Sequence, residues 1–219
     1  MTVTKLFCIV AITLLVVSGL WAATPPDYKG TPFQDAQHKS GPQVIPGRLQ
    51  CALYDLGGEA VAYHDAEALN KGSGELNHTK GHCEAGVPES ICYFREKEGA
   101  DISYTKNQLD FNHPNFFVPP KMQLYIGYTN DGEWVNYTVN VKKAGTYQIV
   151  ALYGKLPTTL KFDVNHKPAG ECKLPLDTGD WHIWNKAACG QIAFPEAGVQ
   201  LLTLHYNLGN NLAYFDFEQ

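Results

Sequence analysis

The sequence predicts an all-β fold, an antiparallel β-sandwich of the jelly-roll type. From residue 44 onward, apolar and polar residues alternate in several short runs, which is the pattern of half-buried strands. The chain also contains 20 glycines and 13 prolines, and turn-forming residues separate the runs. We find no convincing helical period. Many short strands joined by tight turns are typical of sandwiches and jelly rolls.

The clearest strand is predicted over residues 133–141 (EWVNYTVNV), where Val and Tyr alternate with polar residues. A short turn at 143–145 leads into a second strand over 145–153, in which apolar residues again recur with a period of two. Three further strands are predicted at 160–164, 199–206 and 212–217.

Residues 1–22 are predicted to be a signal peptide. One positive charge precedes the apolar run 6–17, which is too short for a comfortable membrane span, and small residues follow it. We expect cleavage after Ala22, with Gly19 as second choice; an uncleaved anchor is the alternative. The mature protein would be secreted or periplasmic, without a membrane partner. Residues 23–43 lack periodicity and predict a flexible leader.

Composition excludes several classes of protein. The 17 basic and 22 acidic residues give a net charge of −5, and no basic stripe is present, so we expect no nucleic-acid partner. Charged residues make up 18% and apolar residues 44%, which fits neither a disordered polyelectrolyte nor a polytopic membrane protein. We expect one domain over residues 44–219, a monomer, with enough residues to bury a core.

Export to an oxidising compartment makes disulfides the expected state of the cysteines. Cys8 leaves with the signal peptide, which leaves five. Two of them bracket a loop with Gly and Pro, and two flank a Trp-containing segment and could join neighbouring strands. The predicted disulfides are Cys83–Cys92 and Cys172–Cys189. Cys51 is left over in a strand-like run and is expected to be a buried thiol.

A metal site is the alternative for one of these pairs. His78, His82, Cys83 and Cys92 lie close together in the sequence. Their spacing matches no standard zinc pattern, and exported chains favour disulfides. We therefore prefer the disulfide over zinc.

Four segments carry a resemblance to a known family. Their order and spacing resemble those of carbohydrate-binding modules of family 6. The segments are 45–65, 126–147, 178–184 (TGDWHIW) and 211–217 (NLAYFDF). The resemblance implies a β-sandwich that binds a polysaccharide or oligosaccharide and has no catalytic residues of its own. The stretch 78–122 is longer than in typical members and is treated as an insertion.

The resemblance also implies which residues contact sugar. A pyranose ring has an apolar face, on which aromatic side chains stack, and hydroxyl groups, which amides and carboxylates orient. Tyr63 and Trp181 occupy the positions of the paired stacking aromatics, and Asn211 that of the amide. Glu59 lies near Tyr63 in the sequence and is a further candidate. The alternatives are core packing for the two aromatics, a turn role for Asn211, and a solvated loop position for Glu59.

A structural calcium is common in the family and requires several hard, preferably charged oxygens. Here Gln50 and Ala52 stand in place of a Glu-x-Glu pair, whereas Asp216 remains as a possible ligand. We expect such a site to be weak, and we expect no required cofactor.

Two other functional classes remain open at this point. A glycosidase would use two carboxylates flanking the scissile bond, and Glu59, Asp65, Asp131 and Glu133 are near the expected site. Sequence motifs of other common enzyme classes do not occur. An adhesion or structural module could instead bind a protein through the 78–122 insertion. A groove lined by converging acids would favour the enzyme, and buried aromatics without a groove would favour the adhesion module.

Overall fold

The computed structural model describes residues 23–36, 41–72, 78–79, 82–83 and 85–219. The predicted signal peptide, residues 1–22, lies outside the described residues. Among the described residues, no helix is long and apolar enough to cross a membrane.

Strands dominate the described chain, in agreement with the prediction. The N-terminal elements are β1 (Gln43–Ile45), β2 (Gly47–Gln50), β3 (Tyr63–His64), β4 (His78–Thr79), β5 (His82–Cys83), α1 (Glu89–Cys92), β6 (Ile102–Tyr104) and α2 (Asn107–Asp110). They are followed by β7 (Leu124–Ile126), β8 (Trp134–Val141), β9 (Gly145–Lys155), β10 (Thr159–Val164), β11 (Lys167–Lys173), β12 (Trp184–Phe194), β13 (Gly198–His205) and β14 (Asn210–Glu218).

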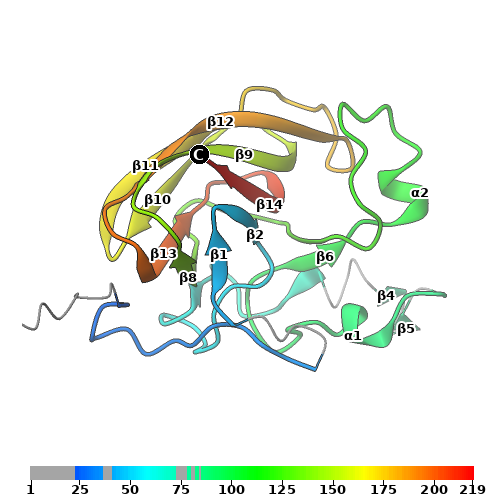
Figure 1. Ribbon diagram of the computed structural model, residues 1–219. Coiled ribbons are helices and arrows are strands. Elements are labelled where there is room, and N and C mark those ends of the chain that lie inside the picture. The colour runs from blue at the N-terminus through cyan, green and yellow to red at the C-terminus, as the bar shows by residue number, and fades with distance from the viewer. Residues whose placement is uncertain (1–22, 37–40, 73–77, 80–81, 84) are drawn as a thin grey trace, which may run out of the picture.

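Most of the described strands form one curled sheet in the order β1-β8-β13-β10-β11-β12-β9-β14-β7-β6, and β4 and β5 form a separate two-stranded sheet. In addition, β2 pairs with β14 and β3 with β8. Figure 1 shows the curl, with β12 and β9 across the top and β8, β13 and β10 below. The sheet is mixed rather than purely antiparallel, because β1 runs parallel to β8. The short strand β1 pairs with β8, whereas β2, which follows it in the chain, pairs with β14. The prediction of a purely antiparallel sandwich is therefore wrong at β1.

The core lies between the two layers of the curled sheet. Phe162 on β10 meets Phe215 on β14 edge to face, with ring centroids 5.2 Å apart. The apolar positions of β8 that the sequence predicted to share a face, from Val135 to Val141, are buried. They alternate with side chains that point away, as the period of a strand requires. The fold class is therefore confirmed as an all-β sandwich.

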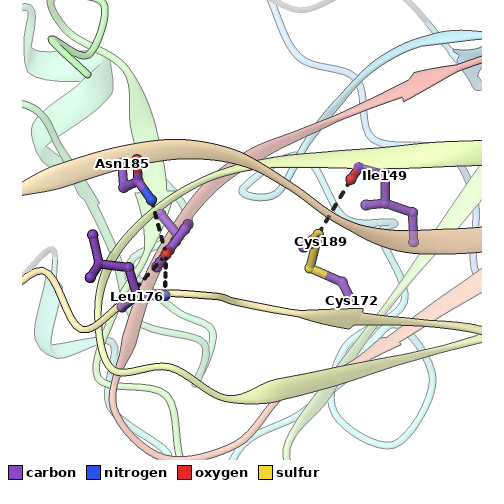
Figure 2. The surroundings of a disulfide bond; sticks show 6 residues. Ile149, Cys172, Leu176, Asn185 and Cys189 are labelled. Atoms are coloured by element: carbon purple, nitrogen blue, oxygen red, sulfur yellow. Dashed lines mark hydrogen bonds between the residues drawn. A yellow bond between two sulfur atoms is a disulfide. The ribbon is translucent and has the colours of Figure 1, made fainter. Parts of the chain in front are cut away.

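Both predicted disulfides are present, with Cα atoms 5.7 Å apart for Cys83–Cys92 and 4.6 Å apart for Cys172–Cys189. Cys189 lies where β12 shifts register against β9, and its sulfur is 3.5 Å from the carbonyl oxygen of Ile149 (Figure 2). This disulfide fastens β11 to β12. Among the described cysteines Cys51 is free and buried, and burial raises the pKa of its thiol.

Part of the segment predicted to be a flexible leader packs against the domain. Thr31 pairs with Leu56 through backbone hydrogen bonds, and the Tyr28 hydroxyl donates to Asp55 at 2.7 Å. Phe33 is buried and meets Phe94 edge to face.

The described part of the 78–122 insertion contributes β4, β5, α1, β6 and α2. Figure 1 shows α1, α2, β4 and β5 on the same side of the molecule, beside the curled sheet. The β6 strand pairs antiparallel with β7 and so extends the sheet edge. The insertion is therefore tied to the sandwich at the edge where β7 meets β14.

Candidate functional site

A pocket of about 180 Å³ opens at the end of the sheet. Its lining residues come from three elements that converge there: β7 and the turn after it, β14, and the turn that precedes β12. The lining residues are Tyr125, Tyr128, Trp181, His182 and Asn211. Because β7 and β14 pair at Ile126 and Leu212, the sheet itself brings the first two of these elements together.

Two aromatic side chains of the pocket are exposed. Tyr128 is 43% and Trp181 40% exposed, although most large apolar side chains of the sandwich are buried. Tyr128 has a φ of 48°, a left-handed backbone conformation that is uncommon outside glycine. Such strain is maintained where the surrounding structure requires it, and it is concentrated at functional sites. The two aromatic rings are thus available to a ligand.

Asn211 places a polar amide in the pocket. Asn211 is only 5% exposed. Its Nδ2 donates to the Trp181 carbonyl oxygen at 2.7 Å, which connects β14 to the turn before β12. A Cβ at position 127 would lie 2.9 Å from the Asn211 Oδ1, so Gly127 leaves room for the amide in this position. The amide retains one N–H and its oxygen lone pairs for a ligand.

The remaining two residues add a phenol and an imidazole. Tyr125 is buried, and its ring meets Trp184 edge to face at 5.1 Å. Burial, followed by the charge of Asp110, raises the pKa of Tyr125, so its hydroxyl stays protonated. His182 lies with its Nδ1 3.1 Å from the Asp110 carboxylate. The pocket therefore combines aromatic faces with hydrogen-bonding groups.

Residues 118–219, which include all five lining residues, match the sequence model of the family described as carbohydrate binding module (family 6). This part of the chain is therefore similar to family 6 carbohydrate-binding modules. No curated protein matches the chain.

Three solved structures of carbohydrate-binding modules are similar to this chain. A module from Clostridium stercorarium in complex with cellobiose is 14% identical, with a TM-score of 0.50, and the match covers 82% of this chain and 98% of that one. A β-1,3-glucan-binding module from Bacillus halodurans is 16% identical, with a TM-score of 0.47 and coverages of 81% and 99%. A module of Cellvibrio mixtus lichenase 5A in complex with cellotriose is 23% identical, with a TM-score of 0.39 and coverages of 44% and 77%.

Of the four residues predicted to contact sugar, the fold brings Trp181 and Asn211 together in the pocket. Tyr63 lies elsewhere, in the core. It is 6% exposed, its ring meets Tyr54 edge to face at 5.6 Å, and its hydroxyl accepts the Gly99 N–H. On the two-residue strand β3, Tyr63 points inward and His64 outward, so Tyr63 cannot serve as an exposed platform.

Glu59 is also outside the pocket lining. Its carboxylate lies 2.5 Å from the Nδ1 of His64 and accepts the Asp65 N–H. These contacts fix the loop that precedes β3. Glu59 therefore lies outside this pocket, and a sugar contact of its side chain stays a prediction.

Sequence reasoning missed Tyr125, Tyr128 and His182. Tyr128 could have been predicted, because it is an aromatic residue at the end of a strand. It follows Gly127 and precedes the turn residues Asn130 to Gly132. Tyr125 and His182 gave no comparable signal, since their role depends on contacts between distant segments.

The residues at the proposed calcium position do not fit a calcium ion. Both oxygens of Asp216 are engaged by cations: Arg48 donates from Nε and Nη2 at 2.7 and 3.0 Å, and Lys186 Nζ lies 2.8 Å away. The side-chain oxygen of Gln50 accepts from Gln123 at 2.7 Å. Ca²⁺ requires roughly six to eight oxygen ligands. A carboxylate that is already neutralised by Arg48 and Lys186 is not available as one of them.

The carboxylates that were candidates for a glycosidase accept hydrogen bonds from the backbone of loops, and none of them lines the pocket. Glu133 accepts the backbone N–H groups of Ala66 and Asn130, and Asp131 accepts that of Leu208. Asp65 accepts that of Glu67, and burial raises its pKa to about 6. Among the described residues that line the pocket, none is Asp or Glu.

The zinc alternative fails for a separate reason. Cys83 and Cys92 are joined in a disulfide, so neither offers the thiolate that zinc binds. The side chains of His78 and His82 lie outside the described part of the structure.

Proposed function

We propose that the pocket is the carbohydrate-binding site and that the chain binds a polysaccharide or oligosaccharide without cleaving it. The observation that carries the proposal is the pair of exposed aromatics, Tyr128 and Trp181, which line one pocket with the amide of Asn211. Aromatic faces stack on the C–H face of a sugar ring, and an amide both donates to and accepts from neighbouring hydroxyls.

The size of the pocket supports recognition of one sugar unit at a time. Its volume of about 180 Å³ is below the ~300–1,000 Å³ of sites that enclose a drug-sized ligand. A single ring inserted between aromatic side chains suits this volume, whereas the rest of a chain would extend into solvent.

Binding without cleavage is supported by the lack of acidic residues among the described lining residues, because hydrolysis of a glycosidic bond requires a carboxylate pair at the bond. We further propose that the module acts outside the cytoplasm as a monomer. Its disulfides support this location, since such bonds persist in oxidising compartments.

The test is calorimetric titration of the mature chain with three probes: cellotetraose, a β-1,3-linked glucotetraose and xylotetraose. Trp181→Ala removes an aromatic contact worth about 1.5–3 kcal/mol, so affinity should fall roughly tenfold to a hundredfold. The melting temperature should change little, because Trp181 is 40% exposed. Tyr93→Ala is the matched control, since Tyr93 is an equally exposed aromatic outside the pocket.

Two outcomes would contradict the proposal. Unchanged affinity in a folded Trp181→Ala variant would exclude the pocket as the binding site. Release of shorter products from any probe would show that the chain is an enzyme. An adhesion module, the third class, predicts no sugar binding at all.

A further inference from the structure

The insertion makes a specific connection to the start of β12, directly after the turn that carries Trp181 and His182. The backbone N–H of Trp184 donates to Asn115 Oδ1 at 2.7 Å, and the N–H of Phe117 donates to the Trp184 carbonyl at 2.9 Å. Asn115 in turn donates to the carbonyl of Asp110 at 2.6 Å. The segment that follows α2 is therefore fixed to the turn that presents Trp181 and His182.

Asp110, the last residue of α2, is at the centre of this connection. Its side chain is fully buried, and its carboxylate accepts the indole N–H of Trp184 at 2.8 Å and the backbone N–H of Lys106 at 2.5 Å. The Nδ1 of His182, 3.1 Å away, completes the set. A buried carboxylate is tolerated when donors surround it, and charge-assisted hydrogen bonds are the strong ones.

The contact with Asp110 determines which nitrogen of His182 carries a proton. The Asp110 carboxylate already accepts the N–H groups of Trp184 and Lys106. When it accepts from Nδ1 of His182 as well, Nε2 is the nitrogen of the neutral ring that keeps a lone pair. The ring of His113 stacks on that of His182 at 6.4 Å and 14°, which restrains it from a second side. His182 lines the pocket and its side chain is 22% exposed.

We propose that the insertion gives the pocket a fixed hydrogen-bond acceptor: Asp110 holds His182 so that Nε2 accepts a hydroxyl of the bound sugar. His182 is then a specificity-determining residue, and Asp110 is a positioning residue that acts through it. The inference rests on the proposed function. Together with the amide of Asn211, His182 would select sugars with a free hydroxyl opposite Nε2 and reject those in which it is absent or substituted.

The first test uses nitrogen chemical shifts of the wild-type chain, which need no variant to fold. Long-range ¹H–¹⁵N spectra at pH 8 should show His182 as the Nδ1–H tautomer. Saturation with whichever of cellotetraose, β-1,3-glucotetraose and xylotetraose binds should shift Nε2 more than Nδ1. An Nε2–H tautomer, or an Nε2 resonance unmoved by a bound tetrasaccharide, would overturn the inference.

The second test measures affinity for the same three tetrasaccharides. His182→Phe keeps a ring of similar size without the acceptor and should lower affinity about threefold to tenfold, the loss of one hydrogen bond. His182→Gln keeps a donor and an acceptor and should recover part of the loss. Asp110→Asn no longer dictates the tautomer and should also weaken binding, but it should add little in a His182→Phe background.

The results separate this inference from the proposed function. If the wild type binds none of the three probes, or if Trp181→Ala binds as tightly as the wild type, the proposed function fails and the inference with it. If Trp181→Ala loses binding but His182→Phe binds as the wild type does, the pocket stands and the role of His182 is wrong.

Discussion

Replacing Asp216 tests whether Arg48 and Lys186, rather than a calcium ion, neutralise its carboxylate. In the wild type, one carboxylate joins Arg48 of β2 to Lys186 of β12 while itself belonging to β14. The Arg48 guanidinium also lies 3.6 Å from the centre of the Tyr214 ring. Asp216→Asn removes the negative charge at constant shape and leaves two cations facing each other.

The expected loss of stability is modest. An exposed ion pair contributes about 0.2–1 kcal/mol, and the Asp216 side chain is 13% exposed, which reduces screening by solvent. Two such pairs suggest a loss of about 1–2 kcal/mol. For a chain of this size each kcal/mol corresponds to about 2–4 °C in melting temperature, so Asp216→Asn should melt about 2–8 °C lower.

The pH dependence follows from the same contacts. Burial alone would raise the pKa of Asp216, but the hydrogen bonds from Arg48 and Lys186 hold it below its usual value. A depressed carboxylate pKa stabilises the folded state above the pKa of the unfolded chain, about 3.9. The difference between wild type and Asp216→Asn should therefore be full at pH 7 and shrink as the pH falls through the folded pKa.

Differential scanning calorimetry provides the assay, with the wild type measured in EDTA and in millimolar Ca²⁺. We expect the same melting temperature in both. Asp163→Asn is the matched control, because Asp163 makes a single pair with His205 and should cost less than Asp216. A rise in melting temperature with Ca²⁺ that Asp216→Asn abolishes would refute the reasoning.

Two further predictions concern stability. Burial raises the pKa of Asp101 to about 7. The contribution of Asp101 to the free energy of unfolding is therefore full below the pKa of the unfolded chain and is lost as the pH rises through 7. Asp101→Asn should raise the melting temperature more at pH 8 than at pH 5, and an equal rise at both pH values would contradict this prediction. Cys172 and Cys189 are separated by 17 residues, and a disulfide that closes such a loop contributes about 3 kcal/mol to stability. Replacing both cysteines by serine should lower the free energy of unfolding in urea by about 2–4 kcal/mol. A urea midpoint equal to that of the wild type would exclude a stabilising role for this disulfide.

The sandwich was predictable because its evidence is local. The alternation in β8 and the turn before β9 follow from the two-residue period of strands, and the cysteine pairs lie on short segments that geometry can join. The direction of β1 was not predictable, because a three-residue strand can pair either way with an edge. Register and direction are determined by partners that are distant in the sequence.

The candidate site was only half predictable for the same reason. Trp181 and Asn211 belong to segments that resemble the family closely, and both line the pocket. Tyr63 belongs to such a segment as well, but it points to the core on β3, and Tyr128 lines the pocket with Trp181 instead. The contact between Asp110 and His182 joins residues 72 positions apart, so no local sequence pattern predicts it.

If sugar binds between the aromatic side chains of the pocket, the indole N–H resonances of the tryptophans should respond selectively. Trp181 lines the pocket, whereas Trp134 lies in a separate groove on the sheet face, and the indole N–H of Trp184 is held by Asp110. In ¹H–¹⁵N spectra of the protein titrated with cellotetraose, β-1,3-glucotetraose and xylotetraose, a bound probe should shift the Trp181 indole N–H strongly and leave that of Trp134 in place. A shift of Trp134 with Trp181 unmoved would contradict the account.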